Sequence, residues 1–214
     1  MALCLVGSEM CIRDSGFTEA ILTQSENMTE TVSELLKLSS IEAGEYDLNM
    51  ENHKLGKLIN QTVKAHQDQA RLRNISLNVQ LEEDIDIVVD ASAFSIILSN
   101  FVTKALKHSP SNSEILIKND LEDDFLTTLS VIDHGKGIPK KYRDRVFERF
   151  FRVDKGRAKH SGGTGLGLAI SKHLARLMGY EVGMKPNKPN GSRFWISVNY
   201  VSSEEEKSLT PELA

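Results

Sequence analysis

A run of glycines leads directly into a helical pattern near the C-terminal end of the chain. The run comprises Gly162, Gly163, Gly165 and Gly167. It precedes apolar residues at helical spacing, namely Leu166, Ile170, Leu174 and Leu177. Such glycines let backbone N–H groups approach a phosphate, and a helix N-terminus favours negative charge. The spacing is neither a Walker loop nor a Rossmann fingerprint, so alone it indicates an anion site only weakly.

Three upstream segments strengthen this interpretation. They are residues 100–109, which begin with asparagine, residues 133–139, which read Asp-His-Gly-Lys-Gly-Ile-Pro, and residues 147–152, which hold three phenylalanines. In order, spacing and content, the four segments resemble the asparagine, first-glycine, phenylalanine and second-glycine boxes of the sensor histidine kinases. That family shares an ATP-binding fold with gyrase, Hsp90 and MutL.

The resemblance extends beyond the four boxes. Residues 25–44 resemble the second helix of the family's dimerisation and phosphoacceptor hairpin, and residues 191–194 resemble the closing glycine motif of its ATP domain. The implied organisation is a hairpin helix over residues 16–45, whose first partner helix is missing, and an ATP-binding catalytic domain over residues 46–201. Residues 202–214 are expected to be a polar tail.

The first fifteen residues have no counterpart in the family. They resemble translated sequencing-adapter sequence, and we interpret residues 1–15 as a non-native segment; the alternative is a natural linker with two unremarkable thiols. Both cysteines, Cys4 and Cys11, fall here, so nothing supports a disulfide or a cysteine metal site in the remainder.

Length and charge exclude several classes of protein. A chain of 214 residues fits one domain plus an appendage. Its formal charge of −4 argues against a duplex-DNA binder, which needs a basic face, and no nucleic-acid partner is expected. No apolar run is long enough to cross a bilayer.

The periodicity of apolar residues predicts the elements. A stripe from Phe17 to Ile41 indicates one long amphipathic helix that ends near Gly44. Further helices are expected over residues 55–72 and 93–107. Strands are expected over residues 47–51, 75–81, 85–89, 114–118, 125–133 and 193–200. The predicted fold is α+β: a two-layer α/β sandwich, with helices on one face of a mixed, largely antiparallel sheet, preceded by the long helix.

In the family, the helix of the asparagine box faces the ATP triphosphate. The resemblance assigns Asn100, Lys107 and His108 to the nucleotide, but Lys104 stands where an asparagine coordinates Mg²⁺. An ammonium has three donors and no acceptor, so it cannot ligate a cation and would repel it. Lys104 could pair with phosphate instead, or extend into solvent. The expected cofactors are ATP and, as in the family, Mg²⁺, whose binding the Lys104 ammonium would oppose here.

The glycine boxes carry the other assignments. In the family, Asp133 would accept a hydrogen bond from the adenine amino group, although an aspartate before glycines is also a common turn former. The remaining nucleotide-binding residues that the resemblance implies are Gly135, Gly137, Ile138, Gly163, Thr164, Gly165, Leu166, Gly167 and Leu168. The basic stretch 152–161 is expected to be a lid from which Arg152, Lys155 or Arg157 reaches the γ-phosphate.

None of the six histidines is assigned as a phosphoacceptor. None stands in the family's motif of His-Glu followed by a basic residue and proline, and none has metal-ligand spacing. They are His53, His66, His108, His134, His160 and His173.

The resemblance therefore implies the ATP-binding part of a sensor histidine kinase. In an intact relative the γ-phosphate passes to a histidine of a homodimeric hairpin and then to an aspartate of a response regulator. The segment would be cytoplasmic, and the resemblance allows either a parent anchored in the bacterial inner membrane by upstream segments or one without an anchor. A gyrase-like ATPase would need a glutamate at the position of Asn100. A degenerate, non-catalytic nucleotide-binding or interaction module remains the alternative, because of Lys104.

Overall fold

The computed structural model describes residues 6–83, 85–122, 126–153 and 163–201. Within them a long helix, α1 (Val6–Glu42), is followed by an α/β body. The other helices are α2 (Leu55–Leu72), α3 (Ala91–His108), the 3₁₀ helix η1 (Lys140–Arg145) and α4 (Gly167–Leu177). The strands are β1 (Glu51–Lys54), β2 (Ser76–Gln80), β3 (Asp86–Val89), β4 (Glu114–Glu122), β5 (Leu126–Ile132), β6 (Glu181–Pro186) and β7 (Ser192–Val201).

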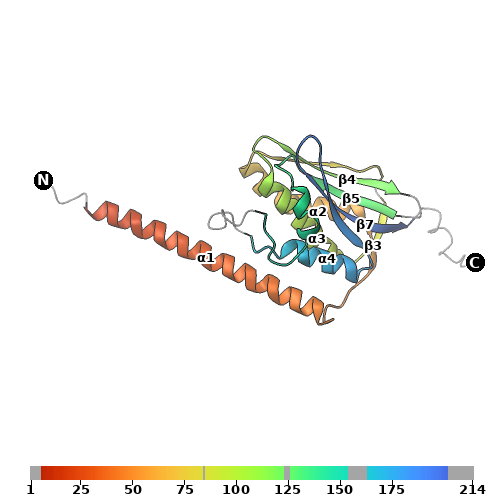
Figure 1. The fold of residues 1–214 in the computed structure, drawn as a ribbon, viewed down its shortest axis with the longest axis horizontal. Helices are drawn as coiled ribbons and strands as arrows, with labels where there is room; N and C mark the ends of the chain where they lie inside the picture. The colour runs from red at the N-terminus through yellow and green to blue at the C-terminus, as the bar shows by residue number, and fades with distance from the viewer. Residues whose placement is uncertain (1–5, 84, 123–125, 154–162, 202–214) are drawn as a thin grey trace, which may run out of the picture.

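The strands form a single mixed sheet. Its order is β1-β3-β7-β5-β4-β2, and β6 also pairs with β7. Among the strands of the described residues, only the β2–β4 pairing is parallel, with Ser76 opposite Glu114. Helices α2, α3 and α4 lie on one side of this sheet, as Figure 1 shows. The predicted fold, a helix-covered, largely antiparallel sheet behind one long helix, is confirmed.

The core lies between the helices and the sheet. Phe101 of α3 stacks on Phe194 of β7 with 5.7 Å between ring centroids, and both side chains are buried. Alternate residues of β5, such as Leu129 and Val131, face the same core. This packing fixes α3 over the centre of the sheet, with its C-terminal end near the end of β5.

Some predicted boundaries were wrong. The first strand begins at Glu51 rather than Asp47. Strand β6 was not predicted, because a central glycine and a terminal proline disfavour strands. Gly183 is required there: a Cβ atom would lie 2.3 Å from the ring of Trp195, which covers it from β7. Helix α1 begins at Val6, well before Phe17, since the preceding stretch has no proline.

The C-terminal end of α1 packs against the body. Leu38 and Ile41 are buried in the core cluster, and Glu42 accepts a hydrogen bond from Arg149. Nε2 of His173, on α4, lies 3.4 Å from the same carboxylate. The N-terminal half of α1 stands away from the body in Figure 1. None of the described helices is long and apolar enough to cross a membrane.

An apolar stripe on α1 is exposed. It comprises Ile21, Leu22, Met28, Val32, Leu35 and Leu36. An amphipathic helix of this kind is stabilised when its apolar side is covered by another helix, because burial of apolar area drives association.

We expect the chain to self-associate through this stripe. Changing Val32 and Leu36 to Asp together should shift the protein to monomers, as measured by sedimentation across a concentration series. The control is Leu72→Asp, which replaces a still more exposed leucine on α2 and should leave the association unchanged. A strictly monomeric wild-type chain at high concentration would contradict the expectation.

Candidate functional site

The asparagine box holds the start of α4 against α3. The Asn100 side-chain amide donates to the carbonyl of Gly167 (2.9 Å) and to the hydroxyl of Ser171 (3.0 Å). A Cβ atom on Gly167 would lie 3.0 Å from Oδ1 of Asn100, a tight contact that favours glycine here. The asparagine therefore positions the glycine run and the N-terminus of α4, where backbone N–H groups favour an anion.

Three cations gather beside the glycine run. Lys104 and Lys107 lie one turn apart on α3, and Arg152 donates to the carbonyl of Gly163 (3.1 Å). A Cβ atom on Gly163, whose φ is +134°, would lie 2.9 Å from Nζ of Lys107. Lys104 is close enough to Lys107 and Arg152 for both to disfavour its charge. We call Lys104, Lys107 and Arg152 the cation cluster.

The three charges of the cation cluster disfavour one another. Burial, and then the charges of Lys107 and Arg152, lower the pKa of Lys104 to about 8. Burial and the neighbouring Arg152 also lower the pKa of Lys107. Because a bound phosphate would favour both charged forms, it would raise both pKa values again. The arrangement therefore suits an anionic ligand with several oxygen atoms.

Asp133 follows β5 and is buried. Its Oδ1 accepts from the backbone N–H of Gly135 (2.8 Å) and of Ser192 (3.1 Å). Burial raises the pKa of this carboxyl, and the two N–H groups counteract that effect. A carboxylate has about four lone-pair sites, so lone pairs remain for a ligand donor such as an exocyclic amine.

Glycines allow the backbone to close around Asp133. A Cβ atom on Gly135 would lie 2.5 Å from the carbonyl oxygen of His108, so this turn touches the end of α3. Gly137 has φ +70° and contacts Gly191. On Gly191, with φ +122°, a Cβ atom would lie 1.9 Å from the Asp133 carbonyl oxygen. The asparagine, first-glycine and closing glycine motifs thus meet at one point.

The second-glycine box contacts the phenylalanine box. The backbone N–H of Phe150 donates to the carbonyl of Gly165 (3.0 Å). A Cβ atom on Gly165 would lie 3.0 Å from the backbone of Phe150. The Thr164 hydroxyl accepts from the backbone N–H of Leu166 (3.1 Å). The side chains of Leu166 and Leu168 are buried in the core, so only their backbone could face a ligand.

Comparison with known families decides what this arrangement is. Residues 89–201 match the sequence model of the histidine kinase-, DNA gyrase B- and HSP90-like ATPases. The chain belongs to this family. The matched range contains every box of the site, and the predicted resemblance is confirmed.

Curated relatives narrow the family to sensor histidine kinases. The sensor histidine kinase WalK of Bacillus subtilis is 30% identical over 189 residues, which cover 86% of this chain and 30% of WalK. The sensor-like histidine kinase SenX3 of Mycolicibacterium smegmatis is 30% identical over 182 residues, or 85% of this chain and 47% of SenX3. The chain thus spans less than half of either relative.

A solved structure confirms the fold. Full-length ShkA in complex with AMPPNP superposes with a TM-score of 0.76 at 24% identity, over 88% of this chain and 39% of ShkA. The chain therefore carries the ATP-binding catalytic domain of a sensor histidine kinase.

The structure brings most of the predicted histidine-kinase site residues into two neighbouring groups. One surrounds the cation cluster and contains Asn100, Gly163, Thr164, Gly165 and Gly167. The other surrounds Asp133 and contains Gly135 and Gly137. His108 contributes its backbone carbonyl next to Gly135, and Ile138 packs on the core. Lys155 and most of the predicted lid lie outside the described residues.

Sequence reasoning missed several contacts. Asn187 donates to the carbonyl of Asp133 (3.0 Å), and Ser192 donates to its carboxylate. The closing glycine motif was the available signal, but it did not reveal this pairing. Glu34 of α1 accepts a hydrogen bond from Thr164, and Glu30 lies near Lys107. No sequence pattern predicts a contact between residues that are so far apart in the chain.

The residues at the expected metal position do not fit Mg²⁺. This ion needs oxygen ligands in near-octahedral geometry. Lys104 offers only N–H donors, so Oδ1 of Asn100, whose NH₂ group donates to Gly167 and Ser171, is the single oxygen ligand that these two side chains could supply. Among the described residues, no group of three or more His, Cys, Asp or Glu side chains could hold a metal ion.

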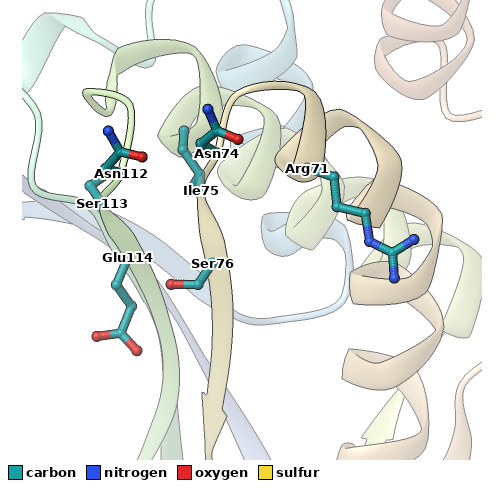
Figure 2. Close-up of a pocket in the computed structure, with 7 residues that line it drawn as sticks. All are labelled: Arg71, Asn74, Ile75, Ser76, Asn112, Ser113 and Glu114. Carbon is teal, nitrogen blue, oxygen red and sulfur yellow. The ribbon is translucent and has the colours of Figure 1, made fainter.

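A separate, open depression lies at the edge formed by β2 and β4. Figure 2 shows its lining residues, which come from the end of α2, the start of β2 and the turn before β4. They are Arg71, Asn74, Ile75, Ser76, Asn112, Ser113 and Glu114. None of the predicted nucleotide-binding residues lines it, so it is distinct from the site.

Gly191→Ala should damage both the fold and the site, because a methyl group would overlap the Asp133 carbonyl. We expect a loss of about 3 kcal/mol in the free energy of unfolding, measured with urea, from strain and overpacking. The control is Gly179→Ala, which shares a positive φ but has no atom within 4 Å of the new Cβ. It should cost about 1 kcal/mol. Equal losses would mean that close packing at Gly191 is unimportant.

Proposed function

We propose that the site binds an adenine nucleotide, with the base at Asp133 and the phosphates at the cation cluster. The buried carboxylate, already held by two backbone N–H groups, supports this most directly. Its remaining lone pairs suit the adenine amino group. Asn100, Lys104, Lys107, Arg152 and the glycine run around Gly163 would surround the phosphates.

The proposed role is that of the phosphoryl-donating part of a sensor histidine kinase. In this role the ATP γ-phosphate passes to a histidine on a hairpin helix, and then to an aspartate of a response regulator receiver domain. The protein would contribute mainly position and charge neutralisation. None of this chain's histidines stands in the phosphoacceptor motif, so the acceptor would come from another segment.

The remaining assignments are also proposals. Residues 16–45, within α1, would belong to the hairpin of a homodimer, and residues 46–201 would form the catalytic domain. The segment would work on the cytoplasmic side of the inner membrane, where ATP and receiver domains are found. The exposed stripe on α1 supports the homodimer.

Lys104 favours a second candidate function. With a cation in place of a metal ligand, the domain would bind nucleotide without transferring phosphate, as a degenerate binding or interaction module. The lowered pKa of Lys104 and its place in the cation cluster support a direct contact with phosphate rather than an extended, solvated side chain.

Asp133→Asn should weaken nucleotide binding by about 1–3 kcal/mol, the scale for losing a hydrogen bond to a charged group. If the oxygen of the new side-chain amide still accepts from the two backbone N–H groups, the NH₂ group of that amide would face the adenine amino group. Two hydrogen-bond donors would then oppose each other. Titration calorimetry with ATP and ADP measures the effect. Asp47→Asn, an exposed aspartate before β1, is the control. Unchanged affinities would refute the adenine contact.

Lys104→Asn should restore Mg²⁺ dependence. In the wild-type chain we expect ATP affinity to change little between EDTA and Mg²⁺, because a cation already occupies the metal's place. The variant should bind more tightly with Mg²⁺, and should phosphorylate a complete acceptor hairpin from a close relative. Lys64→Asn, an exposed lysine of α2, removes the same charge elsewhere and should have neither effect.

Two results would contradict the impaired-site proposal. One is strong Mg²⁺ dependence of ATP binding by the unmodified chain. The other is efficient phosphorylation of the hairpin without the substitution, which would make Lys104 a tolerated variation in an active kinase.

A further inference from the structure

Two glutamates of α1 reach the glycine run and the cation cluster. Glu34 accepts a hydrogen bond from the Thr164 hydroxyl. Glu30, one helical turn earlier, lies close enough to Lys107 for its charge to favour the ammonium. Both carboxylates therefore stand beside groups that the proposed function assigns to the phosphates.

These contacts have an electrostatic cost that a surface helix would not carry. Glu34 is half-buried, and burial raises the pKa of its carboxyl, with a smaller contribution from Glu30. The Thr164 hydroxyl and Lys37 counteract this. The negative side of α1 is thus placed against the positive side of the catalytic domain.

The rest of the α1 contact is independent of the phosphates. Further along α1, Leu38 and Ile41 are buried, and the Glu42 carboxylate pairs with Arg149. These contacts hold the C-terminal end of α1, so the acidic turn would move away by a tilt of the helix about this end. The region of Glu30 and Glu34 is therefore the part that a ligand could displace.

We propose that Glu30 and Glu34 occupy the place of nucleotide phosphates beside Thr164 and Lys107, so that nucleotide binding and docking of this turn of α1 exclude one another. The proposal rests on the proposed function, because it needs the phosphates at the cation cluster. Carboxylates and phosphates are both acceptor-rich anions that seek the same N–H and O–H donors. A polyphosphate entering the site would displace Glu34 from Thr164 and be repelled by both carboxylates. The binding of α1 and of nucleotide would then be linked, each weakening the other by the same factor.

The test is carried out on the full chain with Glu30 and Glu34 both changed to Gln. We expect ATP to bind about three- to tenfold more tightly, the effect of removing two partly exposed like charges. Adenosine, which lacks phosphates, should bind with unchanged affinity. The control changes Glu45 and Glu83 to Gln, two exposed glutamates with the same total charge. It should alter neither affinity.

A second measurement reports the movement. Spin labels are placed at Ser33→Cys on α1, outside the apolar stripe, and Ser95→Cys on α3, both exposed, with Cys4 and Cys11 changed to Ser. ATP should lengthen or broaden the distance distribution between the labels, whereas adenosine should not.

The outcomes separate the two proposals. Chains that bind neither ATP nor adenosine contradict the proposed function. Chains that bind both with the same affinity in the wild type, the variant and the control, and whose label distance does not respond to ATP, contradict only the competition between α1 and the phosphates.

Discussion

The carboxylate of Asp133 is the interaction on which the site depends. Asp133 directly follows β5. Its carboxylate accepts hydrogen bonds from the backbone N–H groups of Gly135 and Ser192, and so connects the first-glycine box to β7. Gly191 fits against its carbonyl with no room for a side chain. Because Phe101 and Phe194 fix α3 over the same strands, the end of α3 meets this turn at His108. The core thus sets the distance between this carboxylate and the cation cluster.

Charge is the second constraint. Lys104, Lys107 and Arg152 gather on one side of the glycine run, and burial of the two lysines depresses their pKa values. A nearby anion favours the charged forms of these lysines and so stabilises the cluster. The glutamates of α1 supply part of that negative charge in the described arrangement, and nucleotide phosphates would supply more. On this view Lys104 takes the place of a metal ion as a positive charge that would neutralise the phosphates. The fold that presents this charge is unchanged.

The sequence was sufficient to predict those features of the fold and the site that depend on local pattern. Helix α2 was predicted at its observed bounds, and the boxes around Asn100, Asp133 and Gly165 converge as expected, because glycine positions and apolar periodicity express local geometry. Strand β6 was missed, since Gly183 makes sense only once the Trp195 ring covers it. The pairing of Glu34 with Thr164 was equally out of reach, because only the docking of α1 brings them together.

The most direct test of the central claim is an ATP titration followed by amide NMR of the nitrogen-15-labelled chain. If adenine nucleotides bind between Asp133 and the cation cluster, the largest shifts will fall on Gly135, Gly137, Gly163 and Gly165. The amide signals of Gly44 and Gly179, which have positive φ values but lie away from the site, will not shift. No response at saturating ATP, or shifts centred on the depression between Asn74 and Glu114, would contradict the site described above.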